Sequence, residues 1–248
     1  MTTKQPHLMV EDGEVNPTVL LPGDPGRVDA IAEHLDGVEE LTHNREYKLV
    51  NGSYDGVPVA VCSTGVGCPS AAVAVEELAN VGVETLIRVG TSGGLQPGIE
   101  VGDIVVATAA AKFEGTTKRY EGVEYPAAAT TDVVNALVDE ASETVDEVHV
   151  GPIVTDDAFY AEEEPASDWE EAGMLAVEME AAVIFTLARR RNIEAGAVVT
   201  VDGNLVEGTQ KGEGGIDADE DEELPEDAQE GVEKEIRIAL GAAAEHAR

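Results

Sequence analysis

Short apolar runs alternate with helix-like segments along most of the chain. The runs of Val, Ile, Leu and Ala predict strands at 18–21, 47–54, 57–63, 85–89, 103–110, 148–155 and 195–201. Helices are predicted at 25–35, 69–81, 131–143, 178–191 and 228–246. The last of these helices has an apolar stripe formed by Val232, Ile236, Ala239 and Leu240. This alternation is typical of an α/β protein, in which helices pack on a sheet.

Turn-forming residues mark several boundaries between these elements. Asp24 is placed as the N-cap of the first helix, and Asp55-Gly56 between two apolar runs is a strong hairpin signal. No segment repeats at a fixed period, and no linker separates two halves. We therefore expect a single domain over residues 1–248. Within it, the segment 211–230 is half Asp or Glu and is expected to be solvated and mobile.

The balance of charges excludes two classes of partner. The 248 residues include 51 Asp and Glu against 15 Lys and Arg, a formal net charge of −36. Nucleic acids and anionic membranes require clustered cations, so neither is an expected partner. With 43% hydrophobic residues the chain still has enough apolar material to fold. The excess of negative charges makes the folded chain repel itself unless salt screens them. At about 1 M salt the Debye length is only about 3 Å, which gives that screening, so we expect a halophilic protein.

The sequence also bears on the cellular compartment. Nothing in the first residues predicts a signal peptide, and no apolar run approaches the roughly 20 residues of a membrane helix. Cys62 and Cys68 form a Cys-x5-Cys pair without a second pair nearby, which argues for reduced thiols rather than a zinc site. We therefore expect a cytoplasmic protein.

Glycine-rich turns follow four of the predicted strands, at 22–27, 63–70, 90–94 and 202–204. Ligands of open α/β sheets bind beyond the carboxyl ends of the strands, so several such turns can converge on one pocket. For any single turn, the simpler interpretation is a tight bend that glycine permits. A dinucleotide site is not favoured, because the second turn lacks the third glycine of that fingerprint and contains Pro69.

Arginines are scarce, and two of them suggest an anion site. Arg88 interrupts a run typical of a central strand, where a buried charge is costly unless a counter-charge meets it. Its nearest acidic neighbour in sequence, Glu84, lies at the other end of the strand, so we expect an anionic ligand to be the partner. Arg27 on the first turn can point to the same end of the sheet. Arg45 lies in a polar stretch, where a surface salt bridge is the simpler interpretation.

Carboxylates in two later segments suit the binding of a sugar and the transfer of a proton to a base. Glu178 and Glu180 flank Met179 before an apolar helix, where the helix dipole alone would also favour acidic residues. One carboxylate could accept hydrogen bonds from sugar hydroxyls while the thioether packs against the sugar. Asp202 ends an apolar strand before Gly203, where Asp often forms a turn. In a desolvated pocket it could act as a general acid.

Together these motifs resemble the trimeric/hexameric nucleoside phosphorylases, the family of bacterial uridine phosphorylase and the hexameric purine nucleoside phosphorylases. The four motifs stand in family order at 21–27, 62–70, 88–93 and 177–181, and the resemblance covers about residues 7–204. It implies a three-layer α/β/α fold whose mixed sheet closes into a distorted barrel. It also implies a hexamer, a trimer of dimers, with active sites shared between neighbouring subunits.

The resemblance assigns a role to each candidate site residue. Phosphate is held by Gly23, Arg27, Arg88, Thr91 and, from the neighbouring subunit, Arg45. The ribose is bound by Glu178, Met179, Glu180 and, at its 5′-hydroxyl, the neighbour's His7. The base lies beside Phe159, Tyr160 and Asp202. A structural K⁺ matches the positions of Glu46, Val66 and Ser70. No other cofactor is expected, since inorganic phosphate is a co-substrate.

The implied reaction is phosphate-dependent cleavage of the N-glycosidic bond, a step of nucleotide salvage, with Arg88 and Asp202 as catalytic residues. Uridine phosphorylases place a Gln and an Arg after the aromatic pair to read uracil, and neither is present in residues 161–165. The segment 201–203 resembles the purine-cleaving members, in which the Asp donates a proton to purine N7. Purine nucleosides are therefore the expected substrates, and uridine phosphorylase is the alternative.

Two other classes of function stay open. A nucleoside hydrolase of the same fold would use water, and its members lack the phosphate-holding arginines that this chain retains. A non-catalytic nucleoside-binding protein would need no general acid.

Overall fold

A computed structural model describes residues 4–208 and 225–247. Among these residues one nine-stranded sheet runs in the order β2-β3-β4-β1-β5-β8-β7-β6-β9, with β5 also paired to β9. The strands are β1 (Thr18–Leu21), β2 (Asp36–Asn44), β3 (Tyr47–Tyr54), β4 (Val57–Cys62), β5 (Thr85–Gly94), β6 (Ile104–Lys112), β7 (His149–Thr155), β8 (Ala176–Glu178) and β9 (Glu194–Asn204). The second pairing of β5 closes β5-β8-β7-β6-β9 into a barrel, from which β1, β4, β3 and β2 extend. Parallel and antiparallel pairs both occur, so the sheet is mixed, as expected.

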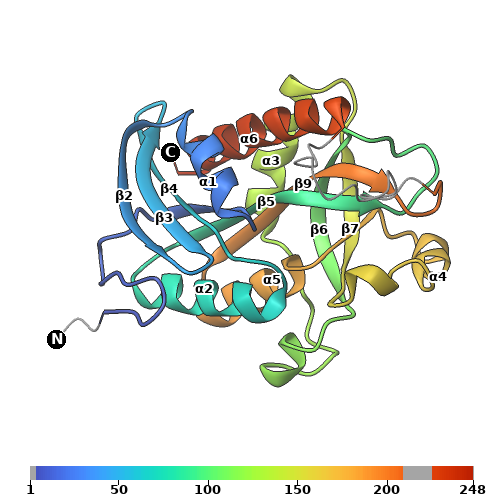
Figure 1. Cartoon of the computed structure of the whole chain (residues 1–248), viewed down its shortest axis with the longest axis horizontal. Coiled ribbons are helices and arrows are strands. Elements are labelled where there is room, and N and C mark those ends of the chain that lie inside the picture. Colours follow the sequence, from blue (N-terminus) through green and yellow to red (C-terminus); the bar gives the residue numbers. More distant parts are fainter. Residues whose placement is uncertain (1–3, 209–224, 248) are drawn as a thin grey trace, which may run out of the picture.

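Helices cover both faces of this sheet (Figure 1). The described helices are α1 (Pro25–Ala32), α2 (Cys68–Asn80), α3 (Thr131–Thr144), α4 (Ala166–Glu171), α5 (Ala181–Arg191) and α6 (Glu226–His246). In Figure 1, α1, α3 and α6 lie above the sheet, whereas α2 and α5 lie below it. The expected three-layer α/β/α arrangement is therefore confirmed. No helix within the described residues has both the length and the apolar character needed to cross a membrane.

The two helical layers enclose separate hydrophobic clusters on the two faces of the sheet. Along β1, Val19 and Leu21 belong to the cluster under α2 and α5, and Leu20 belongs to the opposite one. Successive side chains of a strand point to opposite faces, so a strand covered on both sides must be apolar throughout. This is why the central strands appear in the sequence as continuous apolar runs.

Most predicted elements are confirmed, and the differences have physical causes. The helix predicted at 178–191 begins only at Ala181, because Glu178 ends β8 and accepts hydrogen bonds from the first free N–H groups of α5. Strand β2 was not predicted, because its polar residues are mostly exposed at the edge of the sheet. The short helix α4 was also missed.

The acidic segment expected to be mobile at 211–230 needs a correction. Its last residues, from Glu226, form the first turn of α6, where Glu226 and Asp227 face the positive end of the helix dipole. Residues 211–224 lie outside the described part of the chain.

Close approach of α6 to the sheet depends on Gly231. A Cβ at this position would lie 2.5 Å from Cγ2 of Thr200 and 2.7 Å from the carbonyl oxygen of Gly102. Gly231→Ala should therefore lower the free energy of unfolding by about 1–3 kcal/mol, measured by urea unfolding in molar KCl. The matched control is Gly241→Ala in the same helix, where the Cβ would meet only the flexible carboxylate of Glu140. Equal effects of the two substitutions would contradict this account.

Candidate active site

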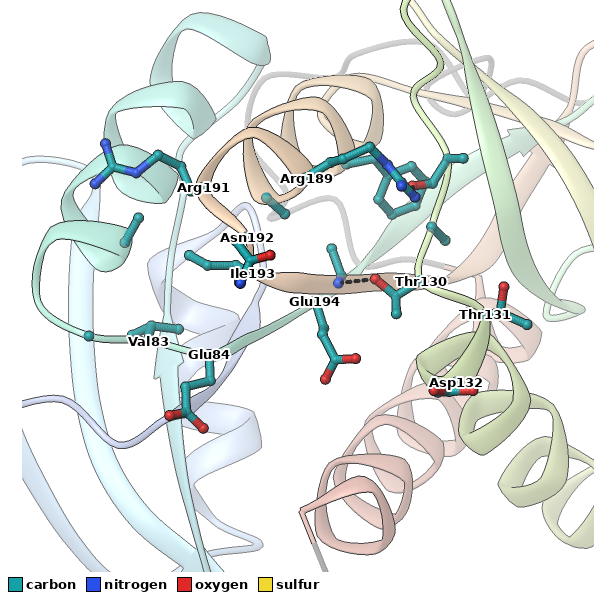
Figure 2. Close-up of a pocket in the computed structure, with 17 residues that line it drawn as sticks. Val83, Glu84, Thr130, Thr131, Asp132, Arg189, Arg191, Asn192, Ile193 and Glu194 are labelled. Carbon is teal, nitrogen blue, oxygen red and sulfur yellow. Dashed lines mark hydrogen bonds between the residues drawn. The ribbon is translucent and has the colours of Figure 1, made fainter.

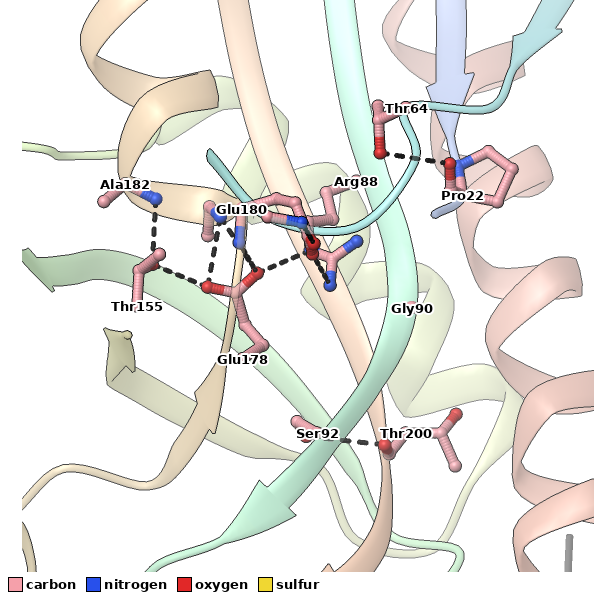
Figure 3. Close-up of polar contacts among 12 residues, drawn as sticks. Pro22, Thr64, Arg88, Gly90, Ser92, Thr155, Glu178, Glu180, Ala182 and Thr200 are labelled. Carbon is pink, nitrogen blue, oxygen red and sulfur yellow. Dashed lines mark hydrogen bonds and ion pairs between the residues drawn. The ribbon is translucent and has the colours of Figure 1, made fainter. Parts of the chain in front are cut away.

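The parallel strands β1, β4, β5 and β9 end at one edge of the sheet, and their turns meet there. The N–H of Thr64 donates to the carbonyl of Pro22 over 2.9 Å, and the N–H of Gly65 donates to that of Gly23 over 2.9 Å. In register, Leu21 at the end of β1 lies opposite Arg88 of β5. The first two turns therefore converge, as Figure 3 shows around Pro22 and Thr64. The turns predicted at 90–94 and 202–204 are wrong, because these residues are the paired ends of β5 and β9 at the same edge.

A buried ion-pair cluster lies at the centre of this edge (Figure 3). Nε of Arg88 is 2.6 Å from Oε2 of Glu178, and its Nη2 is 2.5 Å from Oε2 of Glu180. All three side chains are buried. Burial alone would lower the pKa of Arg88, but the carboxylates of Glu180 and Glu178 raise it above its ordinary value. The expectation that Arg88 lacks a counter-charge in the protein is therefore wrong: Glu178 and Glu180, remote in sequence, supply it.

Glu178 is held by donors on both of its oxygens. Besides Arg88, it accepts from the hydroxyl of Thr155 over 2.6 Å and from the N–H groups of Glu180 and Ala181 over 2.8 and 2.9 Å. The hydroxyl oxygen of Thr155 in turn accepts from the N–H of Ala182 over 2.9 Å. These contacts hold the start of α5 and the guanidinium in one arrangement (Figure 3).

Glu180 connects this cluster to the second glycine-rich turn. Its Oε1 accepts from the N–H of Gly67 over 2.6 Å, while Oε2 faces Arg88. Burial raises the pKa of Glu180, and the positive charge of Arg88 opposes that rise. Because only one protein donor reaches each oxygen, the carboxylate retains lone pairs for further hydrogen bonds.

Gly90 makes room for the guanidinium of Arg88. A Cβ at Gly90 would lie 2.8 Å from Nη1 and 2.9 Å from Cζ of Arg88. The glycine that follows two residues after the arginine is therefore a packing requirement of the ion-pair cluster.

A further buried carboxyl group, that of Glu235 on α6, supports the same strand from the other face. It accepts from the N–H of Gly90 and from the hydroxyl of Thr200, the latter over 3.0 Å. Burial raises the pKa of Glu235 to about 7, against the opposing effect of Arg27. Sequence reasoning missed this residue, although Glu235 stands four positions before Ala239 and thus on the apolar stripe of the predicted helix.

Asp202 occupies an irregularity of the sheet. In the β5–β9 ladder, Ser92 lies opposite Val201 and Gly93 opposite Gly203, so Asp202 is the extra residue of a β-bulge. Bulges of this kind re-aim a side chain next to active sites. Asp202 is 8% exposed, which confirms a largely desolvated position.

Glu162 is a further carboxyl group near Asp202 that the sequence did not reveal. It is 5% exposed, and burial raises its pKa to about 7 with contributions from Asp156, Glu178 and Asp202. Its only signal in the sequence is its position two residues after Tyr160.

The predicted aromatic pair lies at the surface beside Met179. Phe159 and Tyr160 contact each other edge to face, with ring centroids 5.1 Å apart, and Tyr160 is 98% exposed. Together with Met179 they line a hollow of about 350 Å³. The aromatic rings are therefore free to cover a ligand that enters beside Met179.

Comparison with known proteins agrees with this geometry. Residues 17–244 match the family described as the phosphorylase superfamily. The chain belongs to this superfamily. It is 60% identical over 240 residues to guanosine phosphorylase from Halorubrum lacusprofundi, covering 96% of this chain and 98% of that protein. It is 42% identical over 216 residues to uridine phosphorylase from Thermococcus kodakarensis, covering 82% of this chain and 78% of that protein.

A solved structure also resembles the whole chain. Purine nucleoside phosphorylase from Toxoplasma gondii, in complex with immucillin-H, aligns with a TM-score of 0.90 and 31% identity, covering 100% of this chain and 98% of that one. The fold and family inferred from the four motifs are thus confirmed.

The remaining phosphate candidates lie around the same edge. Arg27 is half-buried in the first turn of α1 and interacts electrostatically with Glu235. Thr91 follows Gly90 on β5 and is only partly buried. At Gly23, the Cβ of a larger residue would contact the carbonyl oxygen of Gly65 at 3.5 Å.

His7 and Arg45 lie next to each other but outside the ion-pair cluster. The side-chain amide of Asn44 donates to the carbonyl of His7 over 2.8 Å, and Arg45 follows Asn44 in the exposed turn after β2. Within the described residues, no hydrogen bond or ion pair joins either of them to Arg88.

Two of the residues predicted to hold a cation lie close together within one chain. Oε1 of Glu46 is 3.0 Å from Oγ of Ser70, which also lies 2.5 Å from the carbonyl oxygen of Thr64. Val66, in the same turn, is 75% exposed. Oxygen donors of this kind suit a hard cation, so the residues fit the implied ion. Among the described residues, no group of three or more His, Cys, Asp or Glu side chains could hold a metal.

A second hollow of about 820 Å³ lies at the opposite end of β5 and β9 (Figure 2). Its lining includes Glu84, just before β5, and Glu194, the first residue of β9. It also includes Arg191, which pairs with Glu76 over 2.8 Å. It contains none of the predicted site residues.

The buried position of Glu235 predicts a pH-dependent stability. Its pKa is about 7 in the folded chain against an ordinary 4.5, so between these values only the folded state keeps the proton. The stabilisation is full below pH 4.5 and falls by about 3 kcal/mol as pH rises to 7. Glu235→Gln, which stays neutral, should gain stability relative to the wild type over this range, measured by urea unfolding in molar KCl.

The exposed Glu245 on the same helix provides the control. Glu245→Gln should leave the difference from the wild type nearly independent of pH. A Glu235→Gln difference that is constant from pH 4.5 to 8 would show that Glu235 is not a buried acid with a raised pKa.

Proposed function

We propose that the protein is a nucleoside phosphorylase that prefers purine nucleosides and cleaves them with phosphate to the free base and (deoxy)ribose 1-phosphate. The observation that carries this proposal is the buried contact of Arg88 with Glu178 and Glu180. It places a cation suited to an oxyanion beside carboxylates suited to hydroxyl groups. The similarity to guanosine phosphorylase over nearly the whole chain supports the purine preference.

Phosphate would bind between the first turn and the end of β5. Arg88 uses Nε and Nη2 for its carboxylate partners, and within the described residues Nη1 makes no hydrogen bond. Nη1 therefore has N–H donors to offer an anion, together with the Arg27 guanidinium, the Thr91 hydroxyl and the backbone at Gly23. These donors would orient the phosphate for attack on C1′ of the ribose.

The ribose would be bound mainly by Glu180. Both oxygens of Glu178 are occupied by protein donors, so Glu178 acts by holding Arg88 and the start of α5. Glu180 retains lone pairs for the 2′- and 3′-hydroxyls, and Met179 packs against the sugar. Phe159 and Tyr160 would cover the nucleoside from the surface.

The chemical step follows from this placement. A phosphate oxygen forms a bond to C1′ as the bond from C1′ to the base nitrogen breaks, and that electron pair leaves with the base. Asp202 in its acid form donates a proton to N7 of a purine, which neutralises the leaving group. Uracil offers no equivalent acceptor. The similarity to uridine phosphorylases keeps uridine cleavage as the second candidate function.

His7 and Arg45 would complete the pocket of a neighbouring subunit. We propose that they do so in a hexamer built as a trimer of dimers with shared sites, and a K⁺ at Glu46, Val66 and Ser70 would fit near this contact. The acidic composition, like that expected of a halophile, supports activity in a cytoplasm of high salt.

The reaction is tested by following base release from guanosine, inosine and uridine in molar KCl, with and without phosphate. We expect release to depend on phosphate and kcat/KM to be higher for the purine nucleosides. Asp202→Asn should lower purine cleavage by about 100-fold, because it removes the proton donor. The exposed Asp139→Asn on α3 is the control and should leave the rate unchanged. Equal rates without phosphate would eliminate a phosphorylase, and faster uridine cleavage would reverse the base preference.

Site sharing is tested by co-expressing Arg45→Ala and Arg88→Ala subunits, each expected to be nearly inactive alone. A site is intact only when it takes Arg88 from one subunit and Arg45 from the other. Random mixing should therefore restore at most about a quarter of wild-type activity per site. Mixed oligomers as inactive as the parent variants would show that each chain builds its own site.

A further inference from the structure

Glu77 on α2 forms a second buried carboxylate centre, which the proposed reaction does not yet use. It is 5% exposed, and its donors come from two consecutive residues, His7 and Leu8. Oε2 accepts from the N–H of Leu8 over 2.8 Å and from the N–H of His7 over 3.0 Å. Oε1 lies 2.6 Å from Nδ1 of the His7 ring. One carboxylate thus holds both the backbone and the side chain of His7.

This contact determines which ring nitrogen of His7 is available. An ionised carboxylate only accepts hydrogen bonds, so Nδ1 of His7 must carry the proton. In the neutral ring Nε2 is then left as an acceptor. His149 and His246 differ, because each faces its carboxylate partner through Nε2.

The surroundings keep this ring in place without covering it. Leu8 is fully buried, and the amide of Asn44 holds the carbonyl of His7 over 2.8 Å. The His7 ring meets Tyr47 edge to face, with centroids 6.2 Å apart. The His7 side chain is nevertheless 36% exposed. A side chain fixed on one side and open on the other is suited to contact a molecule outside its own subunit.

We propose that Glu77 is a positioning residue, which fixes His7 as the Nδ1–H tautomer and so presents Nε2 as a hydrogen-bond acceptor to the 5′-hydroxyl of a nucleoside bound in the neighbouring subunit. This inference rests on the proposed function. The acceptor on His7 means that the enzyme favours substrates that carry a 5′-hydroxyl. Nucleosides that lack a donor at the 5′ position leave Nε2 unpaired and are cleaved less efficiently.

The test compares guanosine with 5′-deoxyguanosine in the full enzyme, as the ratio of the two kcat/KM values. Glu77→Gln keeps the size of the side chain but offers one acceptor oxygen and places an amide N–H₂ against the donors of residues 7 and 8. We expect this ratio to fall about tenfold, with cleavage of 5′-deoxyguanosine nearly unchanged. His7→Ala should lower the ratio equally, and the double variant should lower it no further.

The control is Glu76→Gln on the same helix, which breaks only the surface pair with Arg191 and should leave the ratio at its wild-type value. If Glu77→Gln does not fold, Glu77→Asp, whose shorter carboxylate withdraws from the ring, takes its place with the same expected direction.

Two results would overturn the proposal, and they have different meanings. A ratio that falls in His7→Ala but not in the Glu77 variants would mean that Glu77 only anchors the N-terminal segment. A ratio unchanged in His7→Ala would remove the role of His7 itself. Failure of the wild type to cleave guanosine with phosphate would instead refute the proposed function.

Discussion

The buried pairing of Arg88 with Glu178 and Glu180 is the interaction on which the rest of the site depends. Removing a guanidinium from water is costly, and two carboxylates in direct contact offset that cost. Their geometry in turn depends on the start of α5, whose N–H groups hold Glu178, and on Gly90, which leaves space for the guanidinium. The cluster has more carboxylate than guanidinium charge, and it still leaves donors on Arg88 for an anion and lone pairs on Glu180 for hydroxyls.

Buried carboxyl groups that accept backbone N–H groups occur at two other places in this very acidic chain. Glu235 receives the N–H of Gly90 on the opposite face of the sheet, and Glu77 receives the N–H groups of His7 and Leu8. In each case a buried carboxyl group from a helix accepts backbone N–H groups of another segment of the chain. Most of the negative charge stays in solvent, but these few buried groups hold the segments around the site.

The comparisons bear on the family of the protein, and the geometry of the site bears on the base that is cleaved. Similarity over nearly the whole chain identifies the superfamily, and relatives within it are named for either guanosine or uridine. The position of Asp202 on a β-bulge, beside the carboxyl group of Glu162, is the structural feature that bears on the base. In the proposed reaction, a proton donor at this position would suit a purine leaving group better than a pyrimidine.

The local pattern of the sequence was sufficient for most elements and for the first two glycine-rich turns, because periodicity, caps and glycine depend on neighbouring residues. It was not sufficient at 90–94 and 202–204, where pairing between β5 and β9 extends both strands through the glycines. The motifs also predicted Arg88, Glu178 and Glu180 as site residues. Their mutual contact, the buried acids Glu235 and Glu162, and the link from Glu77 to His7 join residues remote from each other in the sequence. Only the closure of β5 against both β8 and β9, with helices packed on each face, brings such pairs together, and burial then gives these carboxyl groups properties that their sequence neighbours do not reveal.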